Sequence, residues 1–165
     1  MIRKLFILML ILSPIVSLGQ KKNRVLESGL PLDTPNNLVR FREVIVKDAT
    51  QAKIYAAALK YFNSKHLVEG TDASTGDFYG RVAFHGTSYF SGINYKFKFE
   101  FAARDGKYRY TFSNINLEGK GGPIESILNS SLMGRAKFIE SIQDDFRGYI
   151  DQMKNSINKE IADEF

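Results

Sequence analysis

The stretch YKFKFEFAARDGKYRYTF, residues 95–112, alternates aromatic with mostly charged side chains on both sides of an Asp-Gly pair. An Asp-Gly pair between two alternating runs favours a two-residue turn that joins the strands of a β-hairpin. With that turn at residues 105–106, the two strands place ring opposite ring. The predicted pairs are Ala103 with Tyr108, Phe101 with Tyr110, and Phe99 with Phe112.

The two faces of this hairpin differ in chemistry because successive side chains of a strand point to opposite sides. If the strand register shifted by one residue, the lysines would be buried, so the aromatic face must point toward a core. The inward set is Tyr95, Phe97, Phe99, Phe101, Tyr108, Tyr110 and Phe112. The outward set is Lys96, Lys98, Glu100, Ala102, Arg104, Lys107, Arg109, Thr111 and Ser113.

This separation argues against a nucleic-acid partner. Proteins that bind single strands present rings beside cations on one surface, because bases stack on the rings while phosphates need the charges. Here the rings and the cations lie on opposite faces. We therefore expect no binding of nucleic acid.

The N-terminal residues 1–19, MIRKLFILMLILSPIVSLG, predict export. Two basic residues precede an apolar run that starts at Leu5 and breaks at Pro14, as in a secretory signal peptide. Ser17 and Gly19 have the small side chains that signal peptidase recognises, so we predict that it cleaves the chain after Gly19. The alternative is a membrane anchor, but the apolar run is short of the about 20 residues that a spanning helix needs. We expect a soluble protein, periplasmic or extracellular, with no stable membrane insertion after cleavage.

The chain contains no cysteine, which excludes disulfides, a thiol nucleophile, a cysteine zinc site and the lipidated cysteine of a lipoprotein. Residues 20–37 are rich in charge, Pro, Gly and Asn and predict a flexible leader. Its three basic residues are fewer than the about four to eight that usually recruit a membrane surface. Residues 38–165 are then a single domain, long enough to bury a core without cross-links.

Two segments on either side of the hairpin predict helices. Thr50 offers an N-cap for the first, and apolar residues follow at the spacing of one helix face. That face is Ile54, Ala57, Ala58, Tyr61 and Phe62. A longer stripe predicts a final helix that covers the whole sheet. This stripe is Phe138, Ile142, Phe146, Tyr149, Ile150, Met153, Ile157 and Ile161.

Extended segments complete the pattern. Residues 39–47 predict a first strand, in which a bulge at Arg42–Glu43 would return Val44 and Val46 to the side of Phe41. Residues 67–68 form a short extended piece before a turn-rich segment. A further strand directs Phe78, Gly80, Val82 and Phe84 inward and Tyr79, Arg81 and His85 outward. Residues 114–135 are expected to be a loop with a helical piece around residues 125–132.

The predicted class is α+β: a curved antiparallel β-sheet of about four to five strands with two helices on one face, in the order strand, helix, four strands, long helix. The segments FREVIV (41–46), YAAALKYF (55–62) and DGKYRYTFSNI (105–115) resemble a secreted Bacteroidota family of unknown function with a TATA-box-binding-protein-like (TBP-like) fold. The resemblance covers about residues 39–161 and implies this architecture. It implies no activity, and the fold name does not carry DNA binding with it.

Catalytic motifs are absent from the sequence. His66 and His85 each lack a second histidine or an acidic partner at metal-ligand spacing. The glycines of GKGGP (119–123) match neither a dinucleotide-binding nor a P-loop pattern. Asp144 and Asp145 are adjacent on a helix and point to different sides. We expect no enzyme activity, no cofactor and no metal site.

Two functions remain open. The first is a non-catalytic module that binds an envelope protein through the polar sheet face, at Arg81, Lys96, Lys98, Arg109 and Thr111. The second is a carrier that holds a small apolar ligand between the sheet and the final helix, as helix-grip proteins do. Its pocket would be lined by Phe97, Phe99, Phe101, Tyr108, Tyr110 and Phe112, with Phe78 and Phe84 beside them. The same rings could instead form a solid core, which is the usual arrangement.

Overall fold

A computed structural model describes residues 32–33, 38–65, 67–87, 93–119, 122–128 and 134–163. The predicted signal peptide, nearly all of the predicted leader and His66 lie outside the described residues.

The central element is an antiparallel sheet of long strands. Its order is β3 (Phe41–Val46), β7 (Lys107–Glu118), β6 (Asn94–Arg104), β5 (Asp77–His85) and β4 (Leu67–Asp72), with β8 (Gly122–Pro123) paired to β7. Two short strands, β1 (Leu32–Asp33) and β2 (Leu38–Val39), pair with each other. Neighbouring strands β5, β6 and β7 are consecutive in the chain, as in a meander.

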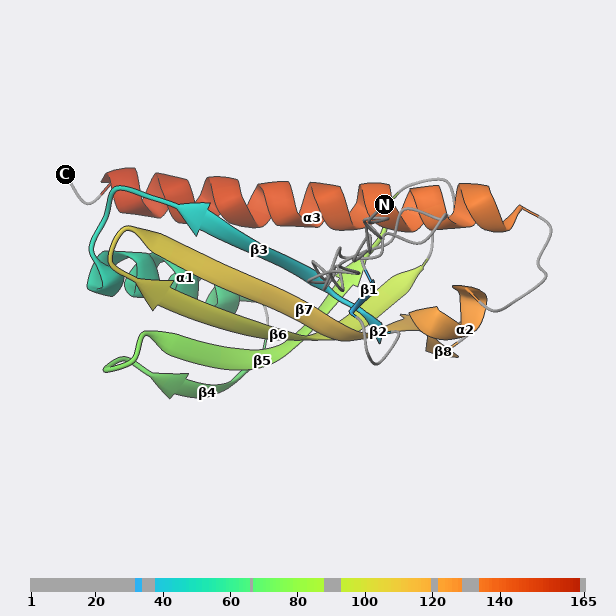
Figure 1. The fold of residues 1–165 in the computed structure, drawn as a ribbon, viewed down its shortest axis with the longest axis horizontal. Helices are drawn as coiled ribbons and strands as arrows, with labels where there is room; N and C mark the ends of the chain where they lie inside the picture. The colour runs from blue at the N-terminus through green and yellow to red at the C-terminus, as the bar shows by residue number, and fades with distance from the viewer. Residues whose placement is uncertain are drawn as a thin grey trace, which may run out of the picture.

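Helices α1 (Gln51–Lys65) and α3 (Arg135–Asp163) cover one face of this sheet, and α2 (Ile124–Leu128) is a short turn of helix after β8. Figure 1 shows α3 running the length of the sheet. Phe62 of α1 stacks on Phe99 of β6 at 4.2 Å between ring centroids, and Phe146 of α3 meets Phe97 of the same strand at 5.4 Å. The predicted α+β class, an antiparallel sheet with a long C-terminal helix, is confirmed.

The predicted register of the hairpin is also confirmed. Phe99 lies opposite Phe112, Phe101 opposite Tyr110, and Ala103 opposite Tyr108. Gly106 adopts a φ of 73°, which suits a residue without a side chain at this turn. The Asp105 side chain also accepts a hydrogen bond from the backbone N–H of Gln51, at 2.7 Å, so the turn holds the start of α1.

Both helices present the predicted apolar faces. The buried residues of α1 are Ile54, Ala57, Ala58, Tyr61 and Phe62, as expected, and the Thr50 hydroxyl accepts from the N–H of Lys53 at 3.4 Å. In α3 the predicted stripe is buried apart from Phe138, which is only partly buried. Ile139, Ser141 and Asp145 are buried there in addition.

The first strand forms as predicted, at Phe41–Val46, but the predicted bulge at Arg42–Glu43 was wrong. Strand β3 pairs with β7 without a bulge, so Val44 lies opposite Arg109 and Val46 opposite Lys107 on the solvent side of the sheet. Val44 is 56% exposed and Val46 83%. Glu43 instead lies on the inner face, at the sheet edge, where the hydroxyl of Tyr110 and the ammonium of Lys154 satisfy its carboxylate at 2.7 and 2.6 Å.

Two strands are longer than predicted. Strand β4 extends to Asp72, and β7 continues to Glu118, into the segment expected to be a loop. Farther along that segment, α2 covers the start of the predicted helical piece, whose residues 129–132 lie outside the described residues. Strand β7 carries a bulge between Ser113 and Asn116, which lie opposite Lys98 and Lys96 of β6, and Asn114 within it has a φ of 53°, in the left-handed region. The extra residue changes the alternation, so that Ile115 and Leu117 point inward after Phe112.

Candidate functional site

The aromatic residues proposed as a pocket lining lie in the core. Phe97, Phe99, Phe101, Tyr108, Tyr110 and Phe112 are each no more than 3% exposed. Their rings contact one another and the helices: Phe101 stacks on Tyr108 at 5.2 Å, and Phe112 meets Tyr149 of α3 at 5.7 Å. The space between sheet and helices is therefore occupied by the rings themselves at these positions.

Gly80 lies in the middle of β5, where the neighbouring strands β4 and β6 leave no room for a side chain. A Cβ at Gly80 would lie 2.8 Å from the Phe99 ring and 2.1 Å from the carbonyl oxygen of Leu67. Real Cβ atoms do not approach so closely, so any side chain here would push both neighbours aside. The Phe99 ring therefore occupies the space that a side chain at position 80 would fill.

The cations proposed as a binding surface lie together on the opposite face, which we call the outer face. Arg81, Lys96, Lys98 and Arg109 are all exposed. The structure differs for Thr111, which is only 9% exposed. Its cross-strand neighbours, Arg42 and Glu100, carry longer side chains on either side of it.

Some of these cations are partnered. Arg81 pairs with Glu69 at 2.7 Å, and Lys96 pairs with Glu118. Lys98 and Arg109 form no salt bridge within the part of the chain that the structure describes. Exposed ion pairs of this kind contribute little to stability, so the cations remain available to a partner.

Exposed apolar side chains also lie on this face, on the edge strand β3 and, at the other side of the sheet, on β4 and β5. Among the described residues, the large exposed hydrophobic side chains are Val44, Val46, Leu67 and Tyr79, at 54% to 83% exposure. Each is paired with an outward-facing residue of the neighbouring strand. The pairs are Leu67 with Arg81, Tyr79 with Glu100, Val44 with Arg109, and Val46 with Lys107. The outer face thus combines cations with exposed apolar contact area.

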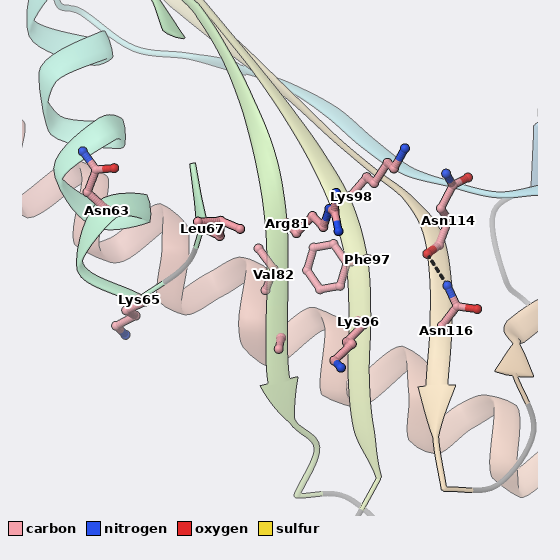
Figure 2. Close-up of a pocket in the computed structure, with 11 residues that line it drawn as sticks. Asn63, Lys65, Leu67, Arg81, Val82, Lys96, Phe97, Lys98, Asn114 and Asn116 are labelled. Atoms are coloured by element: carbon pink, nitrogen blue, oxygen red, sulfur yellow. Dashed lines mark hydrogen bonds between the residues drawn. The ribbon is translucent and has the colours of Figure 1, made fainter. Parts of the chain in front are cut away.

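A groove crosses this face, and we call it the basic groove (Figure 2). It has a volume of about 780 Å³ and extends from the C-terminal end of α1 over β5 and β6 to β7. Its lining includes four cations, three asparagines and no carboxylate. These residues are Lys65, Arg81, Lys96, Lys98, Asn63, Asn114 and Asn116, with Leu67, Val82, Ala83 and Phe97 between them.

Sequence reasoning missed a buried carboxylate. Asp145 of α3 is 7% exposed, accepts a hydrogen bond from the Tyr95 hydroxyl at 2.8 Å, and accepts another from the N–H of Thr87 at 3.0 Å. Gly86 allows this approach, since a Cβ there would lie 2.2 Å from the carboxylate. Burial, followed by the hydrogen bond to Asp145, raises the pKa of Tyr95. The sequence did indicate that Asp145 is buried, because Asp145 lies three residues after Ile142 and so falls on the apolar stripe of α3.

Chemical machinery is sparse in the described residues. His85 is exposed, and its Nδ1 lies 2.9 Å from the side-chain oxygen of Asn94. No group of three His, Cys, Asp or Glu residues in the described ranges could hold a metal ion. Asp144 points outward and binds Arg147 at 2.8 Å, away from its buried neighbour Asp145. No helix in the described part of the chain is long and apolar enough to span a membrane.

Comparison with solved structures identifies the fold. A TBP-like protein from Parabacteroides distasonis superposes with a TM-score of 0.59 at 12% identity, over 76% of this chain and 96% of the other. A DUF4468 family protein from Bacteroides ovatus superposes with a TM-score of 0.53 at 10% identity, over 80% of this chain and 90% of the other. No family model matches the sequence, and no curated protein matches it. The chain therefore has the TBP-like fold that the sequence motifs predict, shared with Bacteroidota proteins, one of which is assigned to a domain-of-unknown-function family.

Proposed function

We propose that this protein is an exported, non-catalytic module that binds an envelope protein through the outer face of its sheet. The observation that carries the proposal is the coincidence of two features on one face. The cations Lys98 and Arg109 and the exposed apolar side chains Val44, Leu67 and Tyr79 all lie there. Such a face offers a partner both apolar contact area and positive charge for electrostatic complementarity.

The alternative, an apolar-ligand carrier, receives no specific support from the geometry, since the rings that would line its pocket contact one another. Native mass spectrometry of protein purified from its host without detergent tests it directly. A bare chain is expected. An adduct that is lost on denaturation would instead favour the carrier.

Site-specific photo-crosslinking tests the binding module. A photoreactive amino acid at Tyr79 on the outer face is expected to give discrete crosslinked species in the envelope fraction. The matched control is the same amino acid at Lys159, an exposed position on α3. Arg109→Glu should weaken the Tyr79 crosslinks. Crosslinks from position 159 alone, or crosslinks from Tyr79 that Arg109→Glu leaves unchanged, would overturn the proposal.

A further inference from the structure

Strand β5 has an open edge. Strand β4 pairs with β5 only as far as Leu67 opposite Arg81, whereas β5 continues to His85 with β6 still paired on its other side. Within the described ranges, no strand pairs with β5 beyond Arg81 on the β4 side. An open edge offers main-chain donors and acceptors to an added strand.

The hydrogen-bond pattern shows which residues offer these groups. The N–H of Gly86 donates to the carbonyl oxygen of Ile93 at 2.9 Å, so Gly86 directs its main-chain groups toward the β6 side. In antiparallel pairing the direction alternates from one residue to the next. Ala83 and His85 therefore direct their N–H and C=O groups away from β6, toward the open edge.

Two hollows meet at this edge. The basic groove borders Arg81, Val82 and Ala83, and a second hollow of about 580 Å³ continues past Ala83, Phe84 and His85 to Thr87. Ala83 and Lys65 line both hollows. The second hollow also contains two carboxylates of α3: Asp144, which pairs with Arg147, and Asp145, which accepts hydrogen bonds from Tyr95 and Thr87. The space beside the edge is thus continuous with the basic groove, whose own lining has four cations and no carboxylate.

We propose that an acidic, extended peptide segment of a partner protein adds a short strand to β5 at Ala83–His85. This proposal rests on the proposed function and names its partner chemistry. Lys96 lies opposite Ala83 on β6. Because Ala83 has only a methyl group, an acidic side chain of the added strand can pass over it toward the Lys96 ammonium, where it would compete with the exposed carboxylate of Glu118. Lys98, which has no salt bridge among the residues that the structure describes, and Lys65 line the same groove.

A peptide suits this site better than other polyanions. Strand addition gains affinity from main-chain hydrogen bonds and specificity from alternate side chains. Polyphosphates and acidic glycans could neutralise the cations, but they have no amide backbone to pair with Ala83 and His85. The inference therefore requires both backbone pairing and negative charge.

The first test is selection of random displayed peptides on the purified chain. Enriched sequences should carry Asp or Glu at alternate positions, and a labelled peptide of that sequence should bind by fluorescence anisotropy. The same peptide N-methylated on its pairing edge keeps its charge and should bind about fivefold more weakly or worse, as expected for one lost hydrogen bond. Enrichment of basic or unpatterned peptides, or binding unaffected by N-methylation, would overturn the proposal.

Protein variants give a second test. Lys98→Glu should weaken the peptide about tenfold, while the matched charge reversal Lys159→Glu should leave affinity unchanged. Ala83→Pro removes one edge N–H and should weaken binding to a similar degree as N-methylation. If Ala83→Pro proves unstable on thermal melting, the N-methylated peptide still decides the question, because it leaves the protein unaltered.

The failure of this inference is distinguishable from that of the proposed function. If Tyr79 crosslinks persist and respond to Arg109→Glu while no acidic peptide binds at β5, the outer face is a binding surface with a different partner. If acidic glycans or polyphosphate compete with equal strength in wild type and Ala83→Pro, the groove recognises charge alone and strand addition is wrong.

Discussion

The inner and outer faces of the β6–β7 hairpin are made by alternating residues of the same two strands, yet they impose different constraints. On the inner face, Phe99 and Phe112 are at most 1% exposed and face each other across the strands. On the outer face, the intervening Lys98 is exposed and lacks a salt bridge within the described residues. Burial makes the inner face decide the fold, whereas the outer face can change its chemistry without unfolding the protein.

Among the variants that test this comparison, Phe99→Ala should change the free energy of unfolding most. Removing a buried ring that stacks on Phe62 should lower the free energy of unfolding by about 3–5 kcal/mol, measured by urea denaturation. The matched control is Lys98→Ala, the next residue on the opposite face, with an expected change within about 0.5 kcal/mol. A loss below about 1 kcal/mol for Phe99→Ala, or equal losses for both, would show that the two faces do not differ as proposed.

Asp145→Ala tests the polar exception among the residues that pack on the inner face. It leaves the Tyr95 hydroxyl and the Thr87 N–H without this acceptor, so we expect a loss of roughly 1.5–3 kcal/mol. The neighbouring Asp144→Ala breaks an exposed pair with Arg147 and should cost at most about 1 kcal/mol.

A double-mutant cycle sharpens this result. Tyr95→Phe removes only the hydroxyl, and its effect should be non-additive with Asp145→Ala because the two groups share one hydrogen bond. Additive losses in thermal or urea unfolding would mean that Asp145 acts through other contacts.

The success and failure of sequence reasoning follow the same division of faces. The hairpin register was predictable because an Asp-Gly turn and a one-sided set of rings allow a single pairing. The facing of β3 was not predictable. Val44 and Val46 are apolar and suggest burial, whereas pairing with Arg109 and Lys107 places them in solvent. An apolar residue near the end of an edge strand carries no local sign of which face it occupies.

The basic groove was only partly predictable. Alternation placed Lys96 and Lys98 on the outer face, but the contribution of Lys65 depends on where α1 ends relative to β5. Strand β7 continues past a bulge at Asn114. The segment SNINLE contains no turn signal from which this bulge could have been predicted. Both features depend on tertiary pairing.

Asn114 is the next test, with a smaller expected effect. At a φ of 53° a β-carbon is disfavoured, and Asn tolerates this region better than Ala does. Asn114→Ala should therefore reduce stability by about 1 kcal/mol, whereas Asn114→Gly should not reduce it by more than a few tenths. If urea denaturation shows equal losses of stability for Asn114→Ala and Asn114→Gly, the Asn side chain, rather than its backbone conformation, maintains the bulge in β7.

Glu43 lies on the inner face at the edge of the sheet, where the two faces meet, and its substitution should change stability least. Burial alone would raise the pKa of its carboxyl, but hydrogen bonds from Lys154 and Tyr110 outweigh burial and lower the pKa below its ordinary value of 4.5. A group whose pKa is lower in the folded state stabilises the protein fully above its unfolded value. That contribution is lost as the pH falls below 4.5 through the folded value.

Glu43→Gln should therefore be slightly less stable than the parent at pH 7, by less than about 1 kcal/mol, and the difference should shrink as the pH falls below 4.5. Urea denaturation between pH 7 and pH 3 measures this convergence. Asp72 and Asp77 also have lowered pKa values, from hydrogen bonds to Ser74 and Arg104 respectively, so both proteins will lose stability in acid and only their difference reports Glu43. Glu140→Gln, on the exposed side of α3, controls for the loss of one negative charge. A constant difference across this range would mean that Glu43 stabilises the border by packing rather than by its charge.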